Sequence, residues 1–179
     1  AQGDLVLLLN SDTTVLPQAL DGIVAFAQEH PEAGAVGGQL LNADMSVQSS
    51  CRHFPTLLNM TTESLGLSSF FPGSPHLARF KMTQWAHHEI QEVDQPSGAF
   101  LLLRKQALHQ VGCLDERFFM YFEEVDLCFR LKRAGWHIYF TPDAREIHLG
   151  GQSSRQNLDA RIVERYKSLI YFFTKYYSL

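Results

Sequence analysis

The chain has 179 residues, of which 45% are hydrophobic, and its formal net charge is -4 at neutral pH. This length and apolar content suffice for one domain with a buried core, because domains typically contain about 100–150 residues. The acidic balance argues against a nucleic-acid partner, which usually binds a basic face. Three cysteines without a CxxC pair predict neither a disulfide framework nor a structural zinc site, so a reducing cytoplasm fits the composition.

The first predicted element is a strand over residues 5–9. Its continuous apolar run, LVLLL, is typical of a strand that is buried on both faces, as in a parallel sheet. Parallel neighbours require crossovers of a dozen or more residues. A central strand this close to the first residue therefore indicates that earlier strands of the fold are missing, and we expect the chain to be part of a longer one.

A helix and a second strand follow this first strand. Pro17 lies in the first turn of the helix and Pro31 comes directly after its end. The apolar face of the helix, at helical spacing, consists of Leu20, Ile23, Val24 and Ala27. Residues 35–41 form the second strand, so the three segments predict a βαβ unit and a mostly parallel sheet.

The middle of the chain, residues 42–95, shows little periodicity. It is longer than an ordinary loop, so we expect it to be either functional or partly helical. Regular patterns return with a strand at 98–104 and a helix at 123–134, whose acidic first turn and basic last turn match the helix dipole. Short strands at 136–141 and 147–149 and an amphipathic helix at 157–179 complete the prediction.

Asn10 and Asp12 follow directly after the first strand. Ligands of open α/β sheets bind outside the carboxyl ends of strands, where a carboxylate can hold a divalent cation that bridges a diphosphate. Equally, these side chains can simply cap the turn and the helix that follows. The residues alone leave both interpretations open.

Three carboxylates, those of Glu123, Glu124 and Asp126, begin the helix at 123–134 and follow the aromatic run at 118–122. Apolar surroundings raise the pKa of a carboxyl toward that of a useful general base, whereas the helix N-terminus lowers it. A solvated first turn that complements the helix dipole is the alternative, although it explains the aromatic residues less well.

His148 lies between two apolar residues, just before a Gly-Gly pair. A neutral imidazole at a strand end is a common metal ligand. A single histidine in such a setting is nevertheless more often a core or surface residue, so the pattern by itself favours neither a metal site nor a substrate site.

Three segments in fixed order resemble glycosyltransferase family 2, especially its rhamnosyltransferase-like bacterial members. They are GDLVLLLNSDTTV, VDQPSGAFLLLRKQALHQVGCLDERFFMYFEEVDLCFRLKRAGW and IHLGGQSS. Several motifs at sensible separations are far more specific than one DxD-like triplet. The resemblance covers almost the whole chain.

The resemblance implies a partial GT-A fold, which is an α/β, Rossmann-like fold with a mixed, mostly parallel sheet flanked by helices. Residues 1–156 would be a catalytic domain that lacks its N-terminal nucleotide-binding half, and residues 157–179 an amphipathic helix of the same domain. Without that half, we expect the chain alone to bind a donor weakly and to be inactive.

The resemblance also assigns a metal site. Asp12, in the DxD-like motif, would bind Mg or Mn on the diphosphate of the donor, with His148 as a further metal or phosphate ligand. Asn10 departs from the strict motif and contributes only a neutral oxygen, which predicts weaker metal binding. A substrate floor would be formed by Ser97, Gly98 and Ala99, because small residues permit close approach.

The acidic pair Glu123-Glu124 corresponds in the resemblance to the pair that supplies the catalytic base, in which Asp usually stands second. Glu124 is one methylene longer, a difference that could move the carboxylate by about 1 Å and lower the rate by about 100-fold. Asp126 is the alternative base. The mechanism implied is inverting, with an acceptor hydroxyl attacking the anomeric carbon in line.

Partners follow from the same resemblance: a nucleotide-sugar donor, with rhamnose as the candidate sugar, and a saccharide or lipid-linked acceptor in cell-surface polysaccharide synthesis. The location would be cytoplasmic, with a peripheral contact to the inner membrane face through the basic C-terminal helix, or with that helix packed on the domain. Two alternatives remain, a non-catalytic carbohydrate-binding or scaffold relative and a metal-dependent phosphohydrolase.

Overall fold

The computed structural model describes residues 3–71, 74, 80–82, 84–150 and 158–177; residues 151–154 of the IHLGGQSS segment lie outside this part. The strands are β1 (Leu5–Leu9), β2 (Thr13–Val15), β3 (Ala33–Leu41), β4 (Val47–Gln48), β5 (Cys51–Arg52), β6 (Gln91–Glu92), β7 (Gln95–Pro96), β8 (Phe100–Arg104) and β9 (His137–His148). The helices are α1 (Ala19–Glu29), α2 (Leu57–Ser64), α3 (Leu67–Phe70), α4 (Lys105–Val111), α5 (Glu123–Arg133) and α6 (Leu158–Tyr177).

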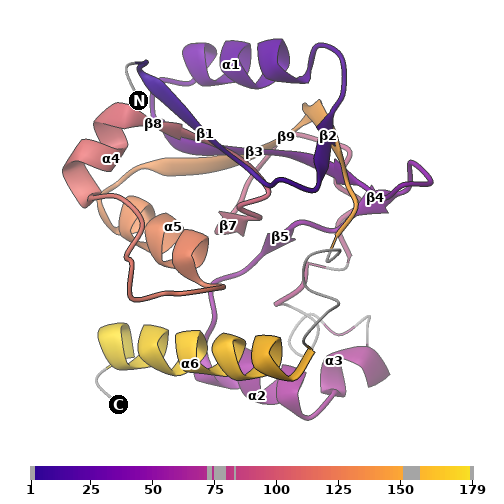
Figure 1. The fold of residues 1–179 in the computed structure, drawn as a ribbon, viewed down its shortest axis with the longest axis vertical. Coiled ribbons are helices and arrows are strands. Elements are labelled where there is room, and N and C mark those ends of the chain that lie inside the picture. The colour runs from indigo at the N-terminus through magenta and orange to yellow at the C-terminus, as the bar shows by residue number, and fades with distance from the viewer. Residues whose placement is uncertain (1–2, 72–73, 75–79, 83, 151–157, 178–179) are drawn as a thin grey trace.

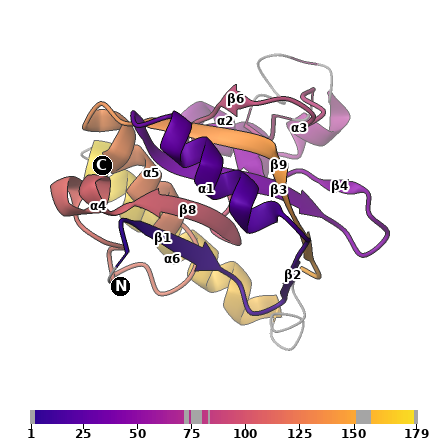
Figure 2. The ribbon, with the colours of Figure 1, turned by 90° about the horizontal axis from the view of Figure 1, so that it is seen from above.

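The elements form layers around a central mixed sheet. Helix α1 covers one face of the sheet, α4 and α5 cover the other, and α6, α2 and α3 lie beyond α5 (Figure 1). Figure 2 shows from above how α1 lies over β8 and β3. The predicted α/β class, with helices on both faces of a mixed sheet, is confirmed.

The prediction of a mostly parallel sheet is wrong. The main sheet has the order β1-β8-β3-β9-β2, and among the described strands only the pair β3 and β9 runs parallel. Strand β8 lies between β1 and β3 and is antiparallel to both, so the two strands of the expected βαβ unit point the same way without being neighbours. Helices cover β8 on both faces, and an antiparallel strand therefore acquires the continuous apolar run that usually marks a parallel one.

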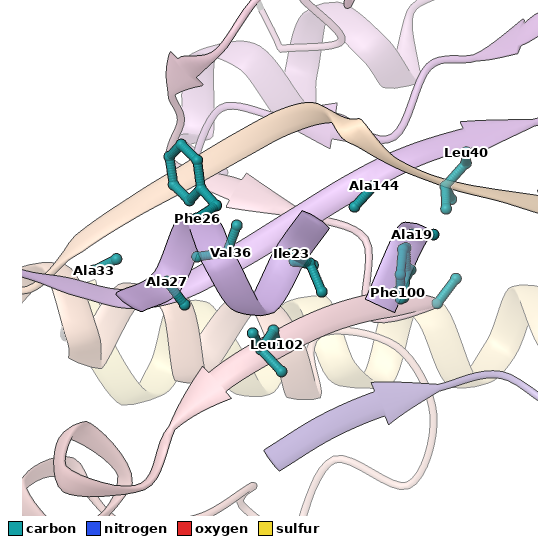
Figure 3. Packing of buried hydrophobic residues seen from close by; sticks show 11 residues of the cluster. Ala19, Ile23, Phe26, Ala27, Ala33, Val36, Leu40, Phe100, Leu102 and Ala144 are labelled. Atoms are coloured by element: carbon teal, nitrogen blue, oxygen red, sulfur yellow. The ribbon is translucent and has the colours of Figure 1, made fainter. Parts of the chain in front are cut away.

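Strand β8 divides the core into two parts by simple alternation. Phe100 and Leu102 point toward α1, where they pack with Ile23 and with Val36 of β3 (Figure 3). Leu101 belongs to the opposite cluster, beneath α4 and α5. Side chains of a strand alternate between faces, so consecutive apolar residues can serve two helical layers.

Two glycines of β3 let the layers approach closely. A Cβ added at Gly37 would overlap the ring of Pro96, and one added at Gly38 would overlap the ring of Phe100. Strand β3 is buried along its whole length. The absence of side chains at these two positions therefore allows the rings of Pro96 and Phe100 to lie directly on β3.

Helix α6 packs against α5 and the loop before it. Phe172 is fully buried and forms a cluster with Phe118, Phe122 and Val125. The hydroxyl of Ser168 donates to the backbone carbonyl of Met120 at 2.8 Å. Helix α6 thus holds the segment that leads into α5.

Residues 42–95, expected to be functional or partly helical, contain α2, α3 and the short strands β4–β6 in their described part. Thr56 caps α2: its hydroxyl accepts a hydrogen bond from the amide of Asn59, whose side chain in turn bonds the amide of Thr56. This reciprocal capping box satisfies amides that would otherwise lack partners.

Candidate active site

A pocket of about 720 Å³ opens at the edge of the sheet where β1 ends and β8 begins. It brings together seven residues that the sequence indicated: Asn10, Ser97, Gly98, Ala99, Glu123, Glu124 and His148. Leu114, Met120 and Tyr121 also line it. Segments far apart in the sequence therefore meet at one site, at the strand edge where ligands of α/β proteins bind.

Strand pairing explains this convergence. Because β8 is antiparallel to β1, its first residue, Phe100, lies opposite the last residue of β1, Leu9. The amide of Asn10 then donates to the carbonyl of Ala99 at 3.0 Å. On the other side, His148 at the end of β9 pairs with Thr13 of β2. The three strand ends are thus fixed by backbone hydrogen bonds.

His148 is oriented by both of its ring nitrogens. Nδ1 lies 2.7 Å from Oε1 of Gln48, an acceptor, so Nδ1 carries the proton and donates. In this tautomer Nε2 is unprotonated: it accepts a hydrogen bond from Nδ2 of Asn10 at 3.4 Å and lies 3.6 Å from Oδ1 of Asp12. Gln48 therefore selects the tautomer whose unprotonated nitrogen faces Asp12.

This arrangement suits a divalent cation with few protein ligands. A carboxylate oxygen and an unprotonated imidazole nitrogen face each other, and both are accepted ligands of Mg or Mn. The described residues contain no cluster of three or more acidic, histidine or cysteine ligands. A cation at Asp12 and His148 would thus have most of its coordination positions left for phosphate oxygens and water.

A strained turn precedes the acidic pair Glu123-Glu124, which lines the pocket. Tyr121 and Phe122 both have left-handed backbone conformations, with φ of 65° and 70°, and Phe122 occupies the N-cap of α5. Each such residue costs about 1–3 kcal/mol and persists only when its surroundings fix it. The next residues, Glu123 and Glu124, line the pocket.

Glu124 is a pocket-lining carboxyl whose pKa is raised. Burial is the main cause that raises its pKa to about 7, and the neighbouring charge of Glu123 adds to the shift. Backbone amides, among them that of Gly98, oppose it. Its Oε2 atom is buried and has no hydrogen-bond partner among the described residues. Gly98 lies against the side chain, since a Cβ there would be 3.4 Å from Cβ of Glu124.

Glu123 stands beside Glu124 and shares its environment. Burial raises the pKa of Glu123 as well, and its Oε2 has no hydrogen-bond partner among the described residues. Two adjacent carboxyls in one partly buried site favour a state with a single negative charge. Glu123 therefore acts on the protonation of Glu124 through proximity.

Asp126, the alternative base, lies elsewhere. Its side chain is completely buried between α5 and α6 and does not line the pocket. Oδ2 accepts a hydrogen bond from Nε of Arg130 at 2.8 Å, and Oδ1 accepts bonds from Nζ of Lys175 and the hydroxyl of Tyr176, both at 2.6 Å. A carboxylate with these partners holds two helices together.

Two residues near the site did not stand out in the sequence. Gln48 lies in a two-residue strand with no pattern of its own. Glu146 shares a face of β9 with Ala144 and is fully buried, and both of its carboxylate oxygens lack hydrogen-bond partners among the described residues. Burial, followed by the charge of Asp12, raises its pKa to about 8. An acidic residue next to buried positions of a strand was its only sequence signal.

Comparison with known proteins agrees with this geometry. Residues 1–167 match the sequence profile described as glycosyltransferase like family 2. The chain belongs to this family. The match includes every candidate site residue, from Asn10 to His148.

The curated relatives that this chain resembles include two rhamnosyltransferases and an O-antigen biosynthesis protein. An N-acetylglucosaminyl-diphospho-decaprenol L-rhamnosyltransferase of Mycobacterium tuberculosis is 33% identical over 98% of this chain and 56% of its own length. The O-antigen biosynthesis protein RfbC of Myxococcus xanthus is 33% identical over 87% of the chain and 12% of its own length. Rhamnosyltransferase WbbL of Escherichia coli is 26% identical over 87% of the chain and 56% of its own length. The chain thus spans about half the length of the two rhamnosyltransferases.

Proposed function

We propose that this chain forms the acceptor-side catalytic part of an inverting, metal-dependent glycosyltransferase. The observation that carries the proposal is Glu124, a carboxylate with a raised pKa in a pocket that also contains His148 and the end of β1. A scaffold or carbohydrate-binding relative would have no use for a strained turn that holds a partly buried acidic pair in a pocket.

Glu124 would act as the general base. It accepts the proton of an acceptor hydroxyl while that oxygen forms a bond to the anomeric carbon of the donor sugar. The bond between this carbon and the diphosphate oxygen breaks, and the nucleoside diphosphate leaves with the electron pair. Attack opposite the leaving group inverts the anomeric configuration. Gly98, which has no side chain, lies directly against the side chain of Glu124 and lines the same pocket.

Asp12 and His148 would hold a divalent cation, Mg or Mn. Such a cation, when bound, would stabilise the negative charge of the departing diphosphate. Nδ2 of Asn10 lies 3.4 Å from Nε2 of His148, so the Asn10 amide would have to turn away from this nitrogen when the cation binds. Glu124 takes the role of base in preference to Asp126, because the latter is already neutralised by Lys175 and Arg130.

The substrates are inferred from the named relatives. Two of them are rhamnosyltransferases, and the name of one specifies a diphospho-decaprenol lipid that carries N-acetylglucosamine. We infer that the donor is a nucleotide sugar, with rhamnose as the first candidate, and that the acceptor is a saccharide or a lipid-linked sugar of the cell surface. A cytoplasmic position at the inner membrane face would give access to both.

The test is a donor screen on the full-length gene product. Calorimetry with dTDP-, UDP- and GDP-sugars in the presence of Mg or Mn, repeated with a chelator, should give heat with one nucleotide class only while metal is present. Glu124→Gln should bind the same donor with unchanged affinity but lose transfer. Unchanged transfer by Glu124→Gln would refute its role, and phosphate release without an acceptor would favour a phosphohydrolase.

A further inference from the structure

Helix α6 lies alongside α5 (Figure 1), and it contacts the part of the chain that carries the acidic pair. No helix among the described residues, α6 included, could cross a membrane. Nζ of Lys175 lies 2.9 Å from Oδ2 of Asp115 and 2.6 Å from Oδ1 of Asp126. The hydroxyl of Tyr171 also donates to Asp115, at 3.1 Å. Helix α6 therefore fixes both ends of residues 115–126, which we call the acidic segment.

Aromatic rings join the middle of the acidic segment to α6. Between ring centroids, Phe118 lies 4.7 Å from Tyr171 and Phe122 lies 5.8 Å from Phe172. Phe118 and Phe122 are both buried. Apolar contacts of this kind are not directional, so they hold the segment on the helix without setting the orientation of its peptide groups.

Polar groups of α6 act on the strained turn within the acidic segment. Tyr121 and Phe122 have left-handed conformations, which persist only when their surroundings fix them. The hydroxyl of Ser168 donates to the carbonyl of Met120, the residue directly before this pair, at 2.8 Å. Nε of Arg161 donates to the hydroxyl of Tyr121 at 2.9 Å. Ser168 thus holds the backbone of the turn, and Arg161 holds one of its side chains.

Ser168 can influence the pocket through Met120 without lining the pocket itself. Its side chain is only 5% exposed, so its hydrogen bond is shielded from water. Glu124 follows Met120 by four positions, and its side chain lies against Gly98. A rotation of the peptide group of Met120 would therefore move the carboxyl of Glu124. A displacement of about 1 Å can lower the rate of a reaction by about 100-fold.

We propose that Ser168 is a positioning residue for the general base. Its hydrogen bond to the carbonyl of Met120 keeps the strained turn in the conformation that places the carboxyl of Glu124 in the pocket. Without this bond the turn would relax toward an unstrained conformation, and α5 would begin in a different place. The inference rests on the proposed function, since the role of Glu124 as the base is itself proposed.

The first experiment compares transfer by Ser168→Ala with transfer by the parent protein, both as full-length gene products. The donors are those of the screen, beginning with dTDP-rhamnose, and the acceptor is a diphospholipid that carries N-acetylglucosamine. We expect kcat and kcat/KM to fall together by about 10–100-fold while KM stays unchanged, because the variant removes no contact with either substrate. Ser168→Thr keeps the hydroxyl and should restore most of kcat.

Thr174→Ala is the matched control on the same helix. The hydroxyl of Thr174 donates to the carbonyl of Ile170, within α6, at 2.9 Å, and Thr174 is exposed. Its loss should leave kcat as it is in the parent protein. A kcat of Ser168→Ala equal to that of Thr174→Ala, measured below the melting temperature of both, would overturn the positioning role. A rise in KM with no change in kcat would overturn it as well.

The second experiment needs no substrate. Carbodiimide with glycine ethyl ester labels accessible carboxyl groups, and mass spectrometry measures the rate at each of them. Glu124 should react several-fold faster in Ser168→Ala than in the parent protein, whereas Asp126, which is completely buried, should stay unreactive in both. An equal gain at Glu124 and Asp126 would show that α6 has loosened as a whole, and this result would overturn a local role for Ser168.

The labelling separates this inference from the proposed function. If the parent protein transfers no sugar from any donor of the screen, the proposed function is overturned, and faster labelling of Glu124 in Ser168→Ala still shows that Ser168 holds this side chain in place. If the parent protein transfers sugar and Ser168→Ala keeps both its kcat and the labelling rate of Glu124, the positioning role alone is overturned.

Discussion

Nδ1 of His148 donates to Oε1 of Gln48 over 2.7 Å, and this bond leaves Nε2 unprotonated where it faces Asp12. A residue of a two-strand hairpin thus decides which nitrogen of a candidate metal ligand is available. Outer partners of this kind orient the imidazole and raise its basicity.

Gln48→Leu should weaken the metal dependence of donor binding. Loss of the hydrogen bond frees the ring to rotate and to change tautomer, which typically lowers metal affinity by about 10–100-fold. The measurement is a Mn titration of donor binding in the full-length gene product. Gln48→Glu, which keeps an acceptor opposite Nδ1, is the matched control and should retain most of the affinity.

The rate should depend on pH through Glu124. Because burial raises its pKa to about 7, the base is largely protonated below that pH. We expect kcat/KM to rise about tenfold per pH unit below about pH 7 and then to level off. A profile without this acidic limb would contradict the assignment of Glu124 as the base.

Glu123→Gln should move that acidic limb to lower pH. The charge of Glu123 contributes to the raised pKa of Glu124, so its removal lets Glu124 ionise more readily. Activity relative to the plateau should then increase at pH 6, even if the plateau itself falls. A lower plateau with an unchanged midpoint would show that Glu123 acts on the substrate and not on the base.

Glu146 should make the protein less stable as pH rises. Its folded pKa of about 8 lies above its ordinary value of 4.5, so the folded state holds a proton that the unfolded state releases between these values. The free energy of unfolding should fall across this window by up to about 1.4 kcal/mol per pH unit. Glu124 contributes in the same direction up to about pH 7.

Glu146→Leu isolates this contribution in urea unfolding at several pH values. The variant should gain stability relative to the parent protein, and the gain should grow from pH 4.5 to pH 8. Asp12→Asn is the companion variant. It removes the charge that helps to raise the pKa of Glu146, so it should narrow the pH range over which the stability falls. A gain that did not vary with pH would show that Glu146 is ionised in the fold.

Asp126→Ala should destabilise the protein by about 3 kcal/mol or more. The change removes the bonds of Lys175 and Tyr176 to Oδ1 and that of Arg130 to Oδ2, and of the two cations only Lys175 keeps a second carboxylate, that of Asp115. Urea unfolding measures the loss. Lys167→Met on the same helix removes an exposed ion pair with Glu164 and should cost less than about 1 kcal/mol. Similar values for the two variants would show that the α5–α6 contact does not depend on this network.

Local sequence patterns determine much of the fold. They predict the helix α1, the strands β1, β3 and β8 and the charged helix α5 within a few residues of their bounds. Each of these elements has either a clear hydrophobic periodicity or a continuous run of apolar residues. These patterns follow from the faces that the element buries. The acidic pair at the start of α5 is visible for the same reason, since it follows an aromatic run directly.

Strand direction is not visible in those patterns. An apolar run indicates burial on two faces, and α1 with α4 and α5 provide that burial whichever way β8 runs. The insertion of β8 between β1 and β3 depends on contacts between residues about 100 positions apart, which local periodicity does not encode.

The sequence by itself determined the types of residue at the site and the family to which the chain belongs. Only the tertiary structure decided their partners: Glu124 lines the pocket while Asp126, two positions on, is buried against Lys175. Successive positions of a helix point in different directions, so the burial and the hydrogen-bond partners of each carboxylate depend on what packs against its side of α5. Helix α6, some 50 residues further along the chain, is the element that packs against the side of Asp126.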